Sequence, residues 1–237
     1  MEVYMGNREE IKRKKKKQQK RKDLTPIIII GTLAVVVALI VILTQIKPVG
    51  EIKIPDRQKA VQTDGLTMGD PNAKVKVVEF ADFQCPACGS YWAGLEPTII
   101  KDYIDSGKAF FTFSPFSFLG NYATDKTWDE SVKAAEAAYC ANDQGKFWEF
   151  HDILFINQKG ENAGAFARVR LLAFAKKLNL DSKTFEKCLD SGKHSQSVTD
   201  ANAYASGQGS NFTPSFLVNG KLVNSGELVQ AIEDALK

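Results

Sequence analysis

An uninterrupted run of uncharged, mostly aliphatic residues divides this chain into two very different parts. It extends from Leu24 to Ile46 and contains no Asp, Glu, Lys or Arg. As a helix it would measure roughly 35 Å, which exceeds the hydrocarbon thickness of a bilayer, about 30 Å. A cleaved signal peptide usually has a shorter apolar region, about 7 to 15 residues, followed by a small-x-small site. No such site follows here, so we expect an uncleaved signal-anchor, a single transmembrane helix.

Basic residues are concentrated directly before this run. Residues 1–23 carry ten Lys or Arg and four Asp or Glu, and the densest block is Lys12–Lys22. Lys and Arg accumulate on the cytoplasmic side of a spanning helix, so the block predicts a cytoplasmic N-terminus in a single-pass cell-membrane protein and an extracytoplasmic remainder. A charge run that abuts a membrane span is usually topogenic, and we therefore expect no nucleic-acid partner.

The remaining chain is expected to be a linker and one folded domain. Pro48, Gly50 and Pro55 lie among scattered charges, which is typical of an unpacked stalk. All four cysteines and all fifteen phenylalanines lie after this stalk, in a part long enough to bury a core. The expected parts are a basic tail at 1–23, a transmembrane anchor at 24–46, a stalk at 47–62 and a folded domain at 63–237.

Hydrophobic periodicity in the folded part predicts strand, helix, strand, helical block, hairpin and helix. The first strand, Lys74–Ala81, is followed by a helix that extends to about Ile104 with a kink at Pro97. From about 121 to 209 the apolar residues recur at helical spacing, in four or five helices. The other expected elements are strands Ala109–Phe113, Ser215–Val218 and Lys221–Asn224, a turn at Asn219-Gly220, and a helix Glu227–Leu236 capped by Ser225. This order predicts an α/β sheet interrupted by a helical insertion.

The first strand leads into a Cys-x-x-Cys motif, Cys85-Pro86-Ala87-Cys88. Such a motif can be structural, metal-binding or redox-active. Tetrahedral zinc normally needs four ligands, and the chain has only two histidines, far apart in sequence, so neither a metal nor another cofactor is expected. Pro86 fits the first position of a helix. Cys85 would then lie at a helix N-terminus, where free N–H groups and the macrodipole stabilise a thiolate.

Three sequence blocks in this order resemble one family: Val77–Cys88, Ala138–Cys140 with Gln144–Trp148, and Thr213–Gly220. They are similar to the DsbA-like thiol-disulfide oxidoreductases, particularly the membrane-anchored Gram-positive type. The resemblance covers roughly residues 63–237 and implies a thioredoxin-like fold with an inserted helical domain. It also implies a protein dithiol:disulfide oxidoreductase that donates disulfides to reduced, unfolded exported polypeptides. A membrane reoxidase of the DsbB type or the vitamin-K-epoxide-reductase-like (VKOR-like) type is the implied partner.

The resemblance assigns roles to individual residues of the motif region. Cys85 would be the nucleophilic half of the active disulfide and Cys88 the resolving half, with a mixed disulfide to substrate as intermediate. Glu79 matches the acidic residue that this fold places beneath the motif. A carboxylate inside a strand is costly to ionise without a partner, so Glu79 either relays the proton of Cys88 or is a structural carboxylate.

The resemblance also implies how substrate is held. Pro214 matches the family's cis-proline, and the backbone of Thr213 would pair with a bound peptide. Pro86 and Ala87, between the cysteines, are expected to contact substrate. Neither is a histidine, whereas some strongly oxidising members have one beside the reactive cysteine. We therefore expect an oxidant of intermediate potential.

Two points stay open from the sequence. Cys188 shares an apolar helix face with Phe185 and Leu189, which is typical of a buried free thiol, whereas an even cysteine count in an oxidising compartment favours a structural disulfide with Cys140. The chain could also be a disulfide isomerase or reductase of the same fold, or a non-enzymatic module that binds metal through the Cys-x-x-Cys motif.

Overall fold

The computed structural model describes residues 9–18, 28–38, 49–55, 62–123 and 127–237, which belong to two units, Met1–Pro48 and Val49–Lys237. In the first unit, residues 9–18 and 28–38 are helical. Among the described residues, no helix combines the length and the apolar character that crossing a bilayer requires. The predicted anchor, Leu24–Ile46, lies partly outside the described residues and stays a prediction.

The second unit is built on one sheet with the strand order β1-β2-β4-β3-β5-β6. β3 and β4 run parallel, and the other neighbouring pairs are antiparallel. The strands predicted at the centre and at the C-terminal edge of the sheet are all present. The bounds are β1 (Thr63–Asp64), β2 (Thr67–Met68), β3 (Val75–Ala81), β4 (Ala109–Pro115), β5 (Ser215–Val218) and β6 (Lys221–Asn224).

The crossover between the parallel strands β3 and β4 is helical, as such a connection normally is. It consists of α2 (Pro86–Gly94), α3 (Glu96–Ile99) and the π-helical segment η1 (Ile100–Ile104). In place of the kink predicted at Pro97, the helix breaks two residues earlier, at Leu95, and Pro97 lies in the first turn of α3. A proline is tolerated there, since the N–H that it lacks would have no helical partner.

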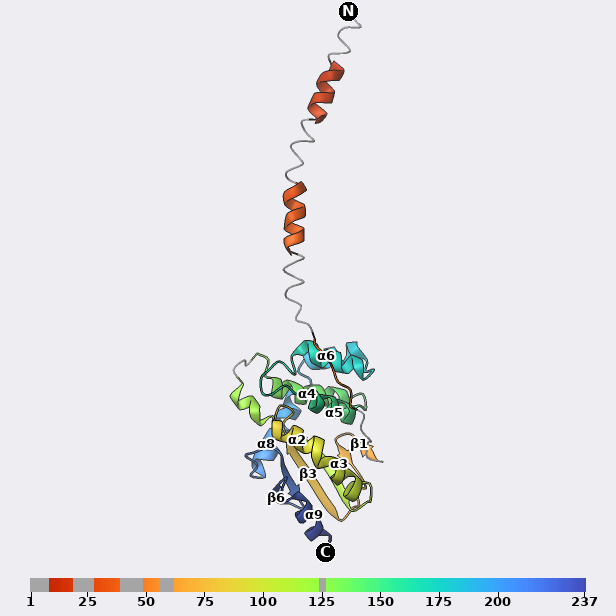
Figure 1. The fold of residues 1–237 in the computed structure, drawn as a ribbon, viewed down its shortest axis with the longest axis vertical. Coiled ribbons are helices and arrows are strands. Elements are labelled where there is room, and N and C mark those ends of the chain that lie inside the picture. Colours follow the sequence, from red (N-terminus) through yellow and green to blue (C-terminus); the bar gives the residue numbers. More distant parts are fainter. Residues whose placement is uncertain (1–8, 19–27, 39–48, 56–61, 124–126) are drawn as a thin grey trace, which may run out of the picture. The chain divides into compact units, whose positions relative to one another are not determined.

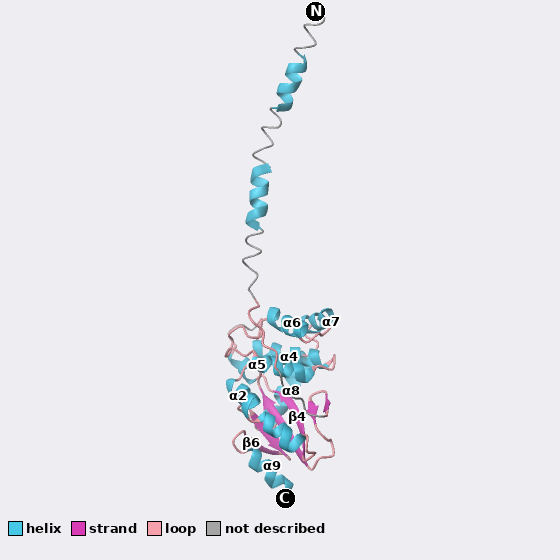
Figure 2. Ribbon diagram, turned by 45° about the vertical axis from the view of Figure 1, so that its right-hand side comes forward, coloured by secondary structure: helices cyan, strands magenta, loops and turns pink. Residues whose placement is uncertain are grey.

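Among the described residues between β4 and β5 there are five α-helices, in agreement with the predicted helical insertion. After the 3-10 segment η2 (Phe118–Tyr122) come α4 (Glu130–Asn142), α5 (Phe147–Ile156), α6 (Arg168–Lys177), α7 (Ser182–Asp190) and α8 (Ser195–Gly207). Figures 1 and 2 show α4 to α7 gathered at one end of the sheet, and the C-terminal helix α9 (Leu228–Leu236) near the opposite end. The insertion therefore adds a helical layer beyond the end of the sheet at which β3 terminates.

Side chains that alternate along β3 belong to two separate cores, because neighbouring residues of a strand point to opposite faces. Val75 and Val77 belong to the larger core, to which η1, α5 and α9 also contribute. Phe80 belongs to the smaller core with Ala205 of α8, and Val78 packs against it. The sheet is thus covered on both faces, and the C-terminal end of β3 leads the chain out between them.

The predicted turn between β5 and β6 is confirmed, whereas the predicted start of α9 is not. Asn219 and Gly220 have positive φ, 48° and 85°, as the predicted two-residue turn requires. The predicted cap at Ser225 is wrong: Glu227 occupies the N-cap position of α9 and no side chain caps the helix there. The Asn224 side chain instead accepts the Gly226 N–H at 2.9 Å, which turns the chain before the helix begins.

The described part of the predicted stalk, residues 49–55, is packed, and we call it the strap. The Lys53 N–H donates to Asn157 Oδ1 at 2.9 Å, and Asn157 Nδ2 donates back to the Lys53 carbonyl at 2.8 Å. The Arg170 guanidinium donates to the Val49 carbonyl, and Ile52 packs against the larger core. Proline and glycine made this segment look unpacked, whereas the helical insertion supplies the partners that hold it.

Candidate active site

Cys85 lies where β3 has ended and α2 begins. It occupies the N-cap position of α2 with extended backbone angles, and Pro86 is in the first turn. The Cys85 N–H donates to the Asp82 carbonyl at 3.0 Å, which closes the turn between strand and helix. Cys85 and Cys88 are both free thiols, so the structure describes the dithiol state of the motif.

The pKa values of the two motif cysteines are shifted in opposite directions. A hydrogen bond from the Cys88 side chain lowers the pKa of Cys85 to about 6, with burial opposing and with help from the Thr213 side chain and the N–H groups of Cys88 and Ala87. Burial, and then the hydrogen bond to Cys85, raises the pKa of Cys88 well above its ordinary value. At neutral pH Cys85 is therefore a thiolate that accepts a hydrogen bond from a protonated Cys88.

The segment at the start of β5 lies directly against the reactive sulfur. The Thr213–Pro214 peptide bond is cis. The Cys85 sulfur lies 3.4 Å from the Thr213 carbonyl oxygen. Pro86 and Ala87 are exposed and Thr213 is half-buried. Thr213, Pro86 and Ala87 thus lie around Cys85, and their contact with a substrate stays a prediction.

Glu79 lies beneath the motif in the middle of β3. It is 1% exposed, and in the sheet register it is flanked by Phe113 on β4 and Phe216 on β5. Its charge contributes to the raised pKa of Cys88. The carboxyl is therefore close enough to act electrostatically on the buried sulfur, whereas the relay role stays a prediction.

Asp82, Phe83 and Gln84 lie between β3 and the motif, and each is only 1% exposed. The Asp82 carboxylate accepts hydrogen bonds from the N–H of Gln84 at 2.8 Å, the N–H of Leu119 at 2.9 Å and the Ser131 hydroxyl. Burial is the main cause that raises the pKa of Asp82 to about 6, these hydrogen bonds oppose the rise, and the charge on Cys85 makes a smaller contribution to it. A buried carboxyl beside the motif is thus the main feature that the sequence did not reveal.

Residues after α5 cover the turn that leads into α2. Gln158 Nε2 donates to the Phe83 carbonyl at 2.6 Å and to the Cys85 carbonyl at 3.2 Å. The Asn162 N–H donates to Gln84 Oε1 at 2.5 Å. A Cβ on Gly89 would lie 2.4 Å from Gln158 Oε1, so glycine in α2 is what allows Gln158 to approach. The helical insertion therefore fixes the backbone of the motif from outside the sheet.

A second contact joins α2 to the insertion through buried polar groups. Trp92 Nε1 donates to Asp152 Oδ1 at 2.8 Å, and His151 Nδ1 lies 2.9 Å from the same oxygen. His151 is fully buried among aromatic rings that include Phe83 and Phe113. The imidazole therefore belongs to the packing between sheet and insertion.

The other two cysteines form a disulfide, one of the two arrangements left open by the sequence. Cys140 of α4 and Cys188 of α7 are joined with a Cα–Cα distance of 5.9 Å. Within the described residues, their sulfurs and a ring nitrogen of His194 form a group within 4.8 Å of one another. A metal would need these sulfurs as thiolates, and here they are bonded to each other.

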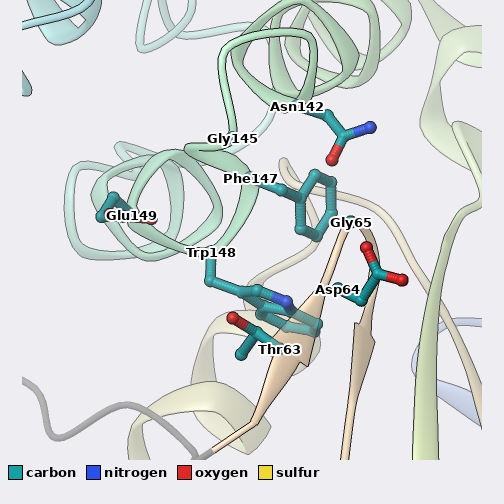
Figure 3. A pocket seen from close by; sticks show the side chains of 8 residues that line it. All are labelled: Thr63, Asp64, Gly65, Asn142, Gly145, Phe147, Trp148 and Glu149. Carbon is teal, nitrogen blue, oxygen red and sulfur yellow. The ribbon is translucent and has the colours of Figure 1, made fainter.

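A surface pocket of about 380 Å³ opens between the β1–β2 turn and the α4–α5 connection, and none of its lining residues belongs to the motif. Figure 3 shows Thr63 and Asp64 from the hairpin facing Phe147 and Trp148 from α5. The site chemistry described above therefore lies elsewhere, at the N-terminus of α2. The pocket is lined by Thr63, Asp64, Gly65, Asn142, Gly145, Phe147, Trp148 and Glu149.

Comparisons with known proteins find relatives that are named for disulfide bond formation. Residues 62–237 match a family model described as thioredoxin. A Bacillus cereus protein named "Probable disulfide bond formation protein D" is 34% identical over 175 residues, which cover 72% of this chain and 78% of that protein. Disulfide bond formation protein D of Bacillus subtilis is 29% identical over 192 residues, which cover 72% and 76%. The crystal structure of oxidised BdbD from Bacillus subtilis superposes with a TM-score of 0.64 at 27% identity, over 73% of this chain and 92% of that one.

Proposed function

Because this chain belongs to the DsbA-like thiol-disulfide oxidoreductases, we propose that it donates the Cys85–Cys88 disulfide to exported, folding proteins from a membrane anchor. The chain is a dithiol:disulfide oxidoreductase of this family. What the proposal adds is the direction of transfer, the class of substrate and the location.

The single observation that carries the direction is the low pKa of Cys85. A fall from 9.0 to about 6 stabilises the thiolate by about 4 kcal/mol, at about 1.4 kcal/mol for each pKa unit. A thiol with a pKa of 9.0 would be protonated at neutral pH, so only about one unit of this shift stabilises the dithiol state there. In a two-electron couple this corresponds to about 30 mV, since about 30 mV equals 1.4 kcal/mol. The thiolate exists only in the dithiol state, so its stabilisation favours reduction of the pair. The Cys85–Cys88 disulfide is therefore a stronger oxidant than a disulfide whose cysteines have ordinary pKa values.

The proposed transfer proceeds in two exchanges. A substrate thiolate attacks the sulfur of Cys85, the Cys85–Cys88 bond breaks, and Cys88 leaves and takes up a proton, consistent with its raised pKa. A second substrate thiolate then attacks the substrate sulfur of the mixed disulfide, and Cys85 leaves as the thiolate. Two substrate thiols are oxidised to a disulfide and the two electrons remain on the cysteine pair. Glu79, beneath Cys88, would pass the proton to the departing sulfur.

Substrate breadth follows from main-chain recognition. An extended peptide that reaches Cys85 would pair with the backbone of Thr213, while exposed Pro86 and Ala87 contact its flank. Hydrogen bonds to a peptide backbone are independent of its side chains. The site would therefore accept many unfolded polypeptides.

The oxidised full chain, mixed with a reduced and unfolded model protein without added metal, should form one substrate disulfide for each chain reduced. A Cys85→Ser variant is the matched control and should form none. The reduction potential of the pair separates donor from reductase: a value as low as that of thioredoxin, about −270 mV, would contradict the proposal.

We also propose that residues 24–46 anchor the chain with the N-terminus in the cytoplasm, and that a DsbB-type or VKOR-like membrane protein reoxidises the motif. The basic block before residue 24 supports this orientation. Protease added to intact cells should digest the C-terminal domain. A domain protected until the cells are lysed would place it on the other side.

A further inference from the structure

The Asp82 carboxylate joins three parts of the molecule at the active site. Oδ1 accepts from the N–H of Gln84, the residue immediately before Cys85. Oδ2 accepts from the Leu119 N–H of η2 and from the Ser131 hydroxyl of α4. The Asp82 carbonyl accepts from the N–H of Cys85 itself. A buried carboxylate is thus held in the turn that leads to Cys85, and the charge on Cys85 acts on it.

The other acidic groups on the surrounding elements are directed elsewhere. Glu79 on β3 acts on the pKa of Cys88. On α4, the Asp129 side chain caps the helix at the N–H groups of residues 131 and 132, and the Glu130 carboxylate accepts the N–H groups of residues 164 and 166. The buried Glu136, also on α4, pairs with Lys133 at 2.7 Å. Among the described residues, the charge on Cys85 is one of the causes that raise the pKa of Asp82.

From this cluster we infer that Asp82 is a positioning residue. Its carboxylate limits the fraction of Cys85 that is ionised in weakly acidic conditions, and Ser131 of the helical insertion sets the strength of this effect. The inference rests on the proposed role of Cys85 as the reactive thiolate. Two like charges in a partly desolvated site repel, so each group makes ionisation of the other harder.

The coupling changes the proton balance of the redox step. In the disulfide state Cys85 carries no charge. Of the two causes that oppose ionisation of Asp82, burial and the Cys85 charge, only burial then remains. Reduction by a substrate dithiol delivers two electrons, Cys88 takes one proton and Cys85 becomes a thiolate. The new charge beside Asp82 then causes the carboxyl to take up part of a second proton. Because the two groups are coupled, their titrations belong to the pair rather than to either residue.

The rate of Cys85 alkylation by iodoacetamide, measured on the full-length dithiol chain from about pH 4.5 to about pH 8.5, tests the inference. The wild-type profile should be broader than a one-proton curve. Asp82→Asn should give a one-proton curve that is complete at lower pH, with a thiolate-to-thiol ratio about three- to tenfold higher near pH 6.5. An unchanged profile in Asp82→Asn would overturn the inference. Titration of Cys85 in the ordinary thiol range in every variant would instead overturn the proposed function.

A milder pair of variants keeps the test valid if Asp82→Asn does not fold. Ser131→Ala removes one hydrogen bond to the carboxylate, which makes Asp82 harder to ionise, so the Cys85 profile should shift in the same direction by about two- to threefold in the thiolate ratio. Ser117→Ala is the control, because the buried Ser117 hydroxyl donates to the Ser131 carbonyl, not to Asp82. An equal shift in both variants would show a general loosening of the site and would refute the role of Asp82.

Discussion

The hydrogen bond from Cys88 is the largest cause of the low pKa of Cys85, and it can be removed without touching the reactive sulfur. In Cys88→Ala the donor disappears, while the N–H groups at the start of α2 stay in place. A hydrogen bond to a charged group contributes about 1.5 to 3 kcal/mol. At about 1.4 kcal/mol for each pKa unit, the pKa of Cys85 should rise by about one to two units.

Cys88→Ser is the matched control for this substitution. A serine hydroxyl in the same buried position can donate to the Cys85 thiolate, so the pKa of Cys85 should stay within about half a unit of the wild-type value. Neither variant can form the active disulfide, so both report on Cys85 alone. The ultraviolet absorbance of the thiolate, followed against pH, gives the ionised fraction directly.

The outcome distinguishes two physical explanations of the reactive thiolate. If Cys88→Ala titrates like the wild type, the hydrogen bond is unimportant and the helix N-terminus alone holds the charge. If both variants rise equally, the sulfur of Cys88 is required for a reason other than donation. Only a rise in Cys88→Ala together with recovery in Cys88→Ser supports the hydrogen-bond explanation.

Two further predictions concern stability. The Cys140–Cys188 bridge closes a sequence separation of 48, so reducing it in a variant that lacks both motif cysteines should lower the free energy of unfolding by about 4 kcal/mol, measured by urea titration; an unchanged midpoint would refute this. Glu130→Gln should lower it by about 1 to 3 kcal/mol, because the buried carboxylate accepts two N–H groups before α6 at 2.8 and 3.0 Å. The exposed Glu186→Gln control should cost under about 1 kcal/mol, and equal losses would contradict the reasoning.

Elements with a local pattern were predictable from the sequence. β5 and β6 have the predicted bounds, and β3 begins one residue later than predicted. The Asn219-Gly220 turn, with apolar residues on both sides of it, identifies the hairpin without knowledge of the rest of the chain. The position of Cys85 at the start of α2 follows from Pro86 in the same way. By contrast, β1 and β2 are two residues each, too short for any alternation to be recognised.

The environment of Asp82 could not be predicted, because its partners come from distant segments. Leu119 and Ser131 follow it by 37 and 49 positions, and only the fold brings them to one carboxylate. The same is true of Gln158, which follows Phe83 by 75 positions. A sequence window around the motif contains the reactive groups but not the insertion that buries them.

The strap has a practical consequence for anyone who shortens this chain. A truncation that begins at β1 would look harmless by sequence, yet it would remove Lys53, whose backbone N–H and carbonyl both pair with the Asn157 side chain. The next residue, Gln158, holds the carbonyls of Phe83 and Cys85. Such a fragment could therefore give redox values that differ from those of the intact protein, and a faithful version should start no later than Val49.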